Sequence, residues 1–170
     1  MTNKNELLLE CLTKYFKDEK KKNILIGVLN NEYNISLRII DWFVTNYCKK
    51  YNIGWNQNNF RFVVHTNYKL QLKGYSKKYF DPFCRRERIY FYYGEENKKL
   101  ITTVGQLNFF KWMIENNIID YIKENYLNIE SDMHNTIKNN ILNKNKRREL
   151  SKSATKTLNK NQSHIILKFE

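Results

Sequence analysis

The chain has 170 residues and a formal net charge of +13, from 30 Lys and Arg against 17 Asp and Glu. Hydrophobic residues make up 41% and aromatic residues 15%, which is enough for a packed core and excludes a wholly disordered chain. No apolar run approaches the ~20 residues of a membrane span, and no signal-peptide pattern follows Met1. We therefore expect a soluble protein of a reducing compartment without membrane contact.

The positive charge is clustered. Residues 61–88 carry eight Lys and Arg against Asp81 and Glu87, and residues 138–160 carry eight against Glu149 alone. Frequent Asn and Lys indicate an AT-rich genome, but a uniform codon bias does not produce two separate blocks. Clustering of this kind is typical of a protein that binds a polyanion, and a solvated surface is the alternative interpretation.

Helical patterns dominate the first fifty residues. Leu8, Leu12 and Phe16 share one side of a helix, and Ser36 is a suitable N-cap for a later one. The expected elements are a helix over residues 5–17, a short helix or strand over 23–30, a helix over 37–50 and a loop over 52–59.

Alternation of side-chain type follows. In residues 60–73 most even positions are apolar (Phe60, Phe62, Val64, Tyr68, Leu70 and Leu72), and most odd positions are polar or basic. Because successive side chains of a strand point to opposite faces, this pattern predicts one long strand with a basic exposed face. A second strand over 86–93 places Arg86, Arg88, Tyr90 and Tyr92 on one face. A turn and a short third strand over 100–103 follow.

The remaining residues predict helices and a basic tail. Thr103 and Gln106 have the spacing of a capping box, which predicts a helix over 104–116 with an apolar continuation to about 124. A narrow stripe at every fourth position predicts another helix over 129–142. The last segments are a basic linker or partner-ordered segment over 143–162 and a C-terminal strand over 163–170 that returns to the core.

These elements predict an α+β fold, with an antiparallel sheet of three or four strands and helices packed on one face. The expected organisation is an N-terminal helical segment (1–34), an α+β core (35–142), the linker and the returning strand.

The main candidate site is the open face of this sheet, with the segment 75–88 that joins its first two strands. Lys and Arg pair with phosphates, and aromatic rings stack on the bases of single strands and loops. The second basic block mixes cations with hydroxyls, and both contact phosphates. The candidate nucleic-acid-binding residues are Arg61, Lys69, Lys73, Lys77, Lys78, Arg85, Arg86, Arg88, Tyr90, Tyr92, Lys146, Arg147, Arg148, Lys152 and Lys156.

Enzyme signatures are missing from the sequence. There is no phosphate-binding glycine loop, zinc-protease helix or nucleophile elbow, and three distant cysteines do not form a disulfide framework. Cys84 lies near three arginines, but no histidine is close to it in the sequence. We assign no catalytic residue, cofactor or metal. A metal-dependent nuclease that uses Asp81 and Glu87 is the least favoured alternative.

Four stretches resemble a known family: residues 35–47, 68–88, 102–112 and 147–156. They are similar to an uncharacterised small-protein family of giant nucleocytoplasmic DNA viruses, of the mimivirus and phycodnavirus kind, over roughly residues 35–169. The resemblance implies a viral protein made in the host cytoplasm, where the viral factory forms, or packaged in the virion, with the nucleus as a further location. It transfers no catalytic residue.

Two classes of function follow. The first is a nucleic-acid-binding accessory protein of a large DNA virus, in replication, transcription or genome packaging. The alternative is a structural, assembly or minor virion protein that binds an acidic protein partner. The sequence leaves open DNA or RNA, single or double strand, and the oligomeric state.

Overall fold

A computed structural model of the protein describes residues 4–57, 59–93 and 98–145. The chain divides into two units, residues 1–135 and 136–170. The described part of the second unit is the end of one helix, residues 136–145. No helix in these described ranges is long and apolar enough to cross a membrane.

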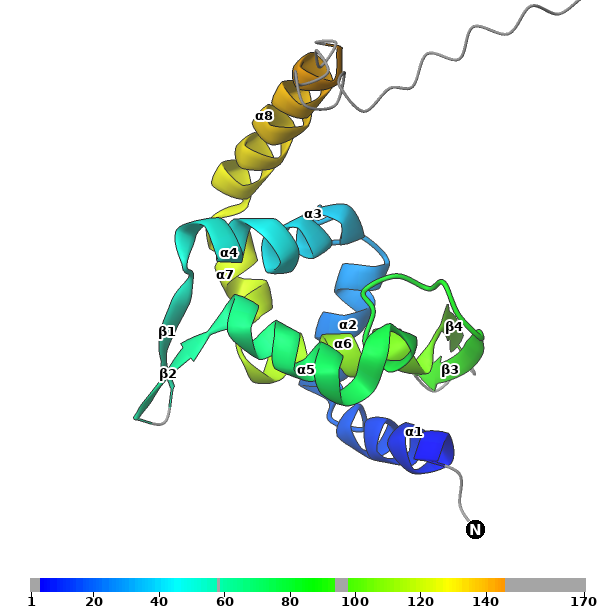
Figure 1. Ribbon diagram of the computed structural model, residues 1–170. Coiled ribbons are helices and arrows are strands. Elements are labelled where there is room, and N and C mark those ends of the chain that lie inside the picture. Colours follow the sequence, from blue (N-terminus) through cyan, green and yellow to red (C-terminus); the bar gives the residue numbers. More distant parts are fainter. Residues whose placement is uncertain (1–3, 58, 94–97, 146–170) are drawn as a thin grey trace, which may run out of the picture. The chain divides into compact units, whose positions relative to one another are not determined.

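Helices make up most of the described chain, and the strands form two separate hairpins (Figure 1). The elements in chain order are α1 (Lys4–Tyr15), α2 (Glu19–Leu29), α3 (Leu37–Trp42), a π-helical turn η1 (Phe43–Tyr47), α4 (Cys48–Tyr51), β1 (Gly54–Gln57), β2 (Phe60–Val63), α5 (Val64–Tyr79), β3 (Ile89–Tyr93), β4 (Lys98–Thr102), α6 (Val104–Glu115), α7 (Ile118–Glu124) and α8 (Tyr126–Asn145). The predicted α+β class is confirmed.

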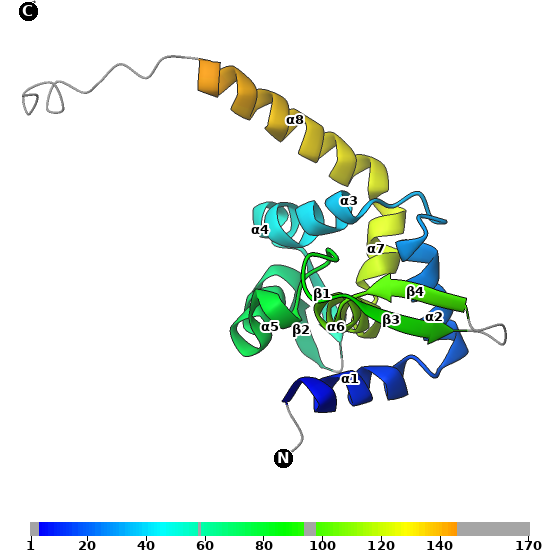
Figure 2. The same cartoon turned by 90° about the vertical axis from the view of Figure 1, so that its right-hand side faces the viewer.

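Helix α6 forms the centre of the first unit, where it contacts α1, α2, α5 and α7 (Figure 2). The Oγ1 atom of Thr103 accepts a hydrogen bond from the Gln106 backbone N–H at 3.0 Å, so the predicted N-cap is confirmed. Aromatic rings from other segments pack on this helix, with the Phe80 ring 5.4 Å from that of Trp112. This packing fixes the end of α5 and the loop that follows it.

The predicted sheet of three or four strands is wrong. Strand β1 pairs antiparallel with β2, and β3 with β4, and the described strands form no further pairs. Figure 1 shows the two hairpins at opposite ends of α5. Residues 54–57, predicted as a loop, form β1, in which Gly54 allows a close approach because a Cβ there would collide with the Phe62 carbonyl oxygen.

The long strand predicted over 60–73 is also wrong beyond Val63, because α5 begins at Val64. Val64, Tyr68 and Leu72 lie four positions apart, and this spacing fits both one face of a strand and one face of a helix. Leu70 separates the two interpretations. A strand would bury it with Tyr68, whereas it is exposed in the structure. The described residues therefore do not form the predicted basic sheet face.

Local signals elsewhere agree with the structure. Residues 23–30 lie largely in helix α2, whose N-cap is Asp18. The helix predicted over 37–50 is the run α3, η1 and α4, and the Ser36 hydroxyl caps it by accepting from the Ile39 N–H. Most of the predicted linker, from residue 146 on, and the predicted strand over 163–170 lie outside the described residues, and the predicted domain boundaries stay predictions.

Candidate nucleic-acid interface

One face of the β3–β4 hairpin is exposed and aromatic. Phe91 points inward, with its ring 6.0 Å from that of Phe16, whereas Tyr90 and Tyr92 are 58% and 63% exposed. The alternation predicted for this strand is therefore confirmed for Tyr90, Phe91 and Tyr92, but the strand begins at Ile89 and not at residue 86, so Arg86 and Arg88 are not part of it. Across the hairpin, Ile101 lies opposite Tyr90 and Lys99 opposite Tyr92. The Lys99 ammonium lies over the Tyr90 ring, 4.8 Å from its centroid.

Exposed cations lead from α5 into this hairpin. Lys77 and Lys78 lie at the end of α5, and Arg86 and Arg88 precede β3. Among the residues that the structure describes, none of these four side chains forms an ion pair. We define the basic–aromatic surface as Lys77, Lys78, Arg86, Arg88, Tyr90, Tyr92 and Lys99.

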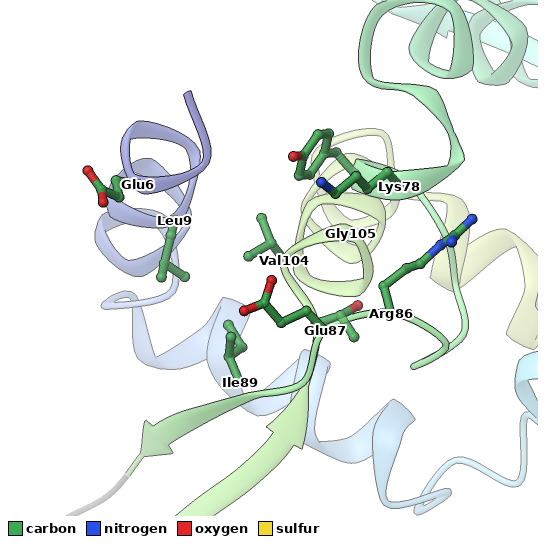
Figure 3. Close-up of a pocket in the computed structure, with 10 residues that line it drawn as sticks. Glu6, Leu9, Lys78, Arg86, Glu87, Ile89, Val104 and Gly105 are labelled. Atoms are coloured by element: carbon green, nitrogen blue, oxygen red, sulfur yellow. The ribbon is translucent and has the colours of Figure 1, made fainter. Parts of the chain in front are cut away.

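A cavity lies between the end of α5 and the segment that precedes β3 (Figure 3). It has a volume of about 380 Å³, and both Lys78 and Arg86 line it, so the end of α5 adjoins the segment before β3. In Figure 3 the Lys78 side chain points toward α1, whereas the Arg86 guanidinium points away from it. Glu6 and Glu87 also line the cavity, so its charges balance, and we assign the cavity itself no anionic ligand.

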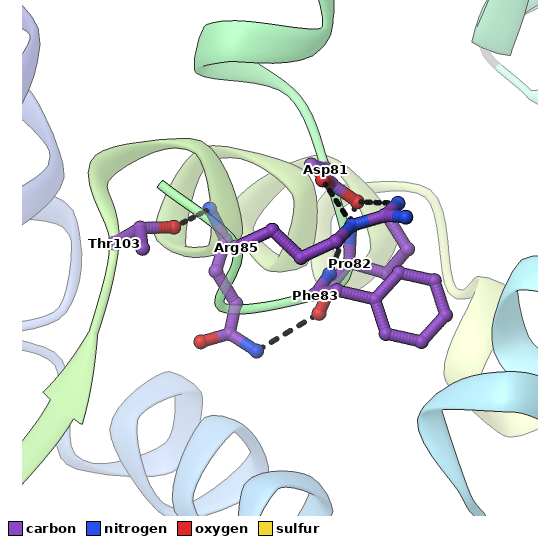
Figure 4. A network of polar contacts seen from close by, with 6 residues as sticks. Asp81, Pro82, Phe83, Arg85 and Thr103 are labelled. Atoms are coloured by element: carbon purple, nitrogen blue, oxygen red, sulfur yellow. Dashed lines mark hydrogen bonds and ion pairs between the residues drawn. The ribbon is translucent and has the colours of Figure 1, made fainter. Parts of the chain in front are cut away.

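Arg85 differs from its neighbours because the protein itself binds its guanidinium (Figure 4). Its Nε and Nη2 atoms donate to the two carboxylate oxygens of Asp81, each at 3.0 Å. Asp81 also accepts from the Phe83 N–H, and its own N–H donates to the Gly105 carbonyl. These bonds hold the loop after α5 on the N-terminus of α6. Arg85 therefore has a structural role that the sequence did not reveal.

Gln106 completes this attachment. Its side-chain Nε2 donates to the Pro82 carbonyl at 2.8 Å, and its Oε1 accepts from the Thr102 hydroxyl at 2.8 Å. In a full capping box this side chain would return to the backbone of Thr103. Here it is directed to the loop instead, so Gln106 donates its backbone N–H to the Thr103 cap and fixes the loop through its side-chain amide.

Two further ionisable groups face the Asp81–Arg85 pair. Asp41 comes from α3, and burial raises the pKa of its carboxyl, while Arg85 opposes that rise. Burial also raises the pKa of Tyr68 to about 12, and the Asp41 and Asp81 charges add to this. The sequence offered Asp41 as one of several carboxylates, but no local pattern connects it to a loop forty residues later.

The other predicted binding residues that the structure describes are not part of the basic–aromatic surface. Arg61 lies on β2, at the opposite end of α5 from β3. Lys69 and Lys73 lie one turn apart on α5 and are exposed. Lys146, Arg147, Arg148, Lys152 and Lys156 lie outside the described residues. Lys99 was not among the predicted residues, because the third strand was predicted over 100–103 whereas β4 begins at Lys98.

The described residues contain no group of three or more His, Cys, Asp and Glu side chains placed to hold a metal ion. Both Asp81 oxygens accept hydrogen bonds, and Glu87 is exposed beside the cavity. The geometry of these two carboxylates thus lends no support to the nuclease alternative.

Comparisons with known proteins identify relatives of this chain. Residues 1–169 match a family of unknown function, DUF7197. The chain is 43% identical over 148 residues to the uncharacterized protein L507 of Acanthamoeba polyphaga mimivirus. This alignment covers 82% of the chain and 57% of the relative, so the chain spans little more than half of that protein's length. No solved structure matches the chain.

The resemblance to an uncharacterised giant-virus family, inferred from residues 35–169, is confirmed. The match also includes the amino-terminal helices, which the recognised motifs did not cover. The chain belongs to the family of unknown function DUF7197.

Proposed function

We propose that this protein is a nucleic-acid-binding accessory protein of a large DNA virus, acting in genome replication, transcription or packaging. Its place would be the viral factory in the host cytoplasm or the virion, with the nucleus as a further location. The observation that carries the proposal is the basic–aromatic surface, in which four exposed cations without ion pairs lie at the end of α5 and just before β3, and two exposed tyrosines follow along β3. Cations position phosphates, and aromatic rings contact bases.

The pairing pattern of the charges supports this choice. Elsewhere in the first unit some cations lie within 4 Å of an acid, as Lys14 does with Glu10 and Lys111 with Glu115. Others, such as Lys17 and Lys20, form no ion pair in the described region but are not next to exposed tyrosines of a strand in the sequence. The cations around β3 lack such partners, although their mutual repulsion lowers stability. A polyanion would relieve that repulsion and release its own condensed counterions, which makes binding strong at low salt.

Fluorescence anisotropy tests the proposal. The purified, nuclease-treated full chain is titrated into labelled single-stranded DNA, duplex DNA and single-stranded RNA across a salt series. The test variant is Arg86→Ala with Arg88→Ala, and Arg85 is kept because its loss would disturb the loop. The matched control is Lys17→Ala with Lys20→Ala, which removes two exposed cations that form no ion pair in the described region.

We expect the Arg86 and Arg88 variant to bind about tenfold more weakly or worse, with a salt slope reduced by about 2, because two phosphate contacts are lost. The control should change little. If the two variants weaken binding equally, or if no probe is bound at ~150 mM salt, binding reflects only net charge and the proposal fails.

A second candidate function, a structural or assembly protein, rests on a different surface. A cavity of about 460 Å³ lies between the β1–β2 hairpin and α5, and its lining includes Arg61 and two exposed apolar side chains, Phe60 and Leu70. Exposed apolar residues beside a cation are typical of an interface with an acidic protein partner. Light scattering of nucleic-acid-free protein tests this candidate. A stable assembly that Phe60→Ser with Leu70→Ser dissociates would favour it over nucleic-acid binding.

A further inference from the structure

Tyr90 and Tyr92 present exposed aromatic rings on one face of β3. Most tyrosines of the first unit that lie near the core pack on other rings, as Tyr68 does on Phe80 and Trp112. Within the described ranges, neither Tyr90 nor Tyr92 makes a ring–ring contact. Both rings leave one strand on the same side, and both are more than half exposed. They form a small platform of two rings.

The spacing of this platform fits unstacked bases. Residues two apart on a strand are separated by ~6.8 Å, which is twice the rise per residue. Successive bases of a duplex strand are ~3.4 Å apart and cover one another's faces. Two tyrosines at the larger spacing therefore cannot each stack on successive bases of an intact duplex. An extended single strand, with its bases turned out, has exposed faces that do fit such rings.

Two cations lie near the platform. Arg88 is exposed, precedes Tyr90 by two residues and directly precedes the first residue of β3. Lys99 covers the Tyr90 ring with its ammonium, as a cation–π pair. A base that stacks on Tyr90 would displace this ammonium, and the flexible Lys99 stem would then allow it to reach a phosphate.

From these relations we infer that the protein binds single-stranded nucleic acid, with two unpaired bases stacked on Tyr90 and Tyr92 and the adjoining phosphates bound by Arg88 and Lys99. This inference rests on the proposed function and adds the class of nucleic acid to it. The competing arrangement is a hairpin inserted as a two-stranded ribbon into the major groove of a duplex.

Two double variants separate stacking from simple apolar contact. Tyr90→Leu with Tyr92→Leu keeps apolar bulk but removes both rings. Tyr90→Phe with Tyr92→Phe keeps both rings and removes the hydroxyls. Phe60→Leu is the matched control, because Phe60 is an exposed aromatic residue of the other hairpin. Affinities are measured by anisotropy for a thymidine single strand and for a blunt duplex of equal length.

We expect wild type, the Phe variant and the Phe60 control to prefer the single strand. The Leu variant should lose about tenfold or more in single-strand affinity per ring and bind the duplex unchanged. Because both side chains are exposed, its melting temperature should equal that of wild type. A second readout needs no variant. Ultraviolet crosslinking of a bromouracil-substituted single strand, followed by mass spectrometry, should place the crosslinks on Tyr90 and Tyr92.

The outcomes distinguish this inference from the function on which it rests. If no nucleic acid is bound by wild type, the proposed function fails and the inference falls with it. If binding depends on Arg86 and Arg88 but duplex is bound as tightly as single strand, or if the Leu variant binds normally, only the inference is overturned. It is also overturned if the crosslinks lie elsewhere, or if the Leu variant changes only self-association.

Discussion

Arg85 binds Asp81 through both carboxylate oxygens, at 3.0 Å from Nε and from Nη2. The pair closes a loop of five residues against the first turn of α6, because the same Asp81 donates its N–H to the Gly105 carbonyl. It also divides three neighbouring arginines by role. Arg85 holds the loop, whereas Arg86 and Arg88 form no ion pair among the residues described.

Arg85→Ala is therefore expected to destabilise the protein. After this change, the buried Asp81 carboxylate keeps the hydrogen bond from the Phe83 backbone N–H but loses both bonds from the guanidinium. The free energy of unfolding should fall by about 1–3 kcal/mol. Urea unfolding followed by circular dichroism measures this. Arg86→Ala is the control and should stay within about 0.5 kcal/mol of wild type. Equal stability of the two variants would contradict a structural role for Arg85.

Gly105→Ala should separate α5 from α6. An added Cβ would lie 2.9 Å from the Lys78 carbonyl oxygen and 3.3 Å from the Phe80 nitrogen, and both are backbone atoms that cannot rotate away. We expect a loss of about 1–3 kcal/mol in the free energy of unfolding. Gly74→Ala in α5 provides the opposite control, because apart from the surrounding helix backbone no atom would lie within 4 Å of the added Cβ. That change should stabilise the protein by about 0.5–1 kcal/mol. If Gly105→Ala leaves the free energy of unfolding unchanged, the close contact between α6 and the end of α5 is contradicted.

Asp132 predicts a specific loss of stability in acid. Burial favours its neutral form, but hydrogen bonds from Lys50, Trp42 and Tyr51 hold its pKa below the usual value. The folded state therefore binds this proton less readily than the unfolded state. The resulting stability is present above the unfolded pKa of ~3.9 and is lost as the pH falls through the folded pKa.

Thermal melting of wild type and Asp132→Asn across the acid range tests this sign. The variant should be less stable at neutral pH, and the difference from wild type should shrink as the solution becomes acidic. Asp120→Asn is the control, because that carboxylate is exposed and lies 3.7 Å from Lys123. A difference that stays constant with pH would show that the charge of Asp132 is not responsible.

The cysteines should react in the order of their exposure. Cys11 is exposed, whereas Cys48 is buried and burial raises the pKa of its thiol. Because the thiolate is the reactive form, alkylation of the native protein should label Cys11 and leave Cys48 unmodified. Mass spectrometry of native and urea-unfolded samples measures this, and Cys48 should react only after unfolding. Rapid native labelling of Cys48 would contradict its place in the core.

Local sequence signals predicted much of the secondary structure. The caps at Ser36 and Thr103 depend on a side chain and an N–H within three residues, so they can be read without knowledge of the fold. The alternation of Tyr90, Phe91 and Tyr92 was equally informative, because odd and even positions differ in exposure across β3. The same reasoning failed at Val64, Tyr68 and Leu72, whose spacing of four fits either structure.

Contacts with distant residues decided that ambiguous segment. Asn67 accepts a hydrogen bond from Trp112 Nε1 at 2.7 Å, and the Tyr68 ring packs on Phe80. His65 Nδ1 lies 3.1 Å from the Val44 carbonyl oxygen in the π-helical turn. A helix brings these side chains to α6 and η1 together, and none of their partners is a neighbour in the sequence.

By itself, the sequence determined the two basic blocks, the helix caps, the exposed tyrosines of β3 and the membership in a giant-virus family, because each depends on composition or on residues a few positions apart. The tertiary structure alone decided that the hairpins lie at opposite ends of α5, that Asp41 faces Arg85, and that Arg85 is held by Asp81 while Arg86 and Arg88 stay unpaired in the described chain. The reason is physical. The use of a charged side chain depends on which groups folding brings within hydrogen-bond reach, and no local periodicity carries that information.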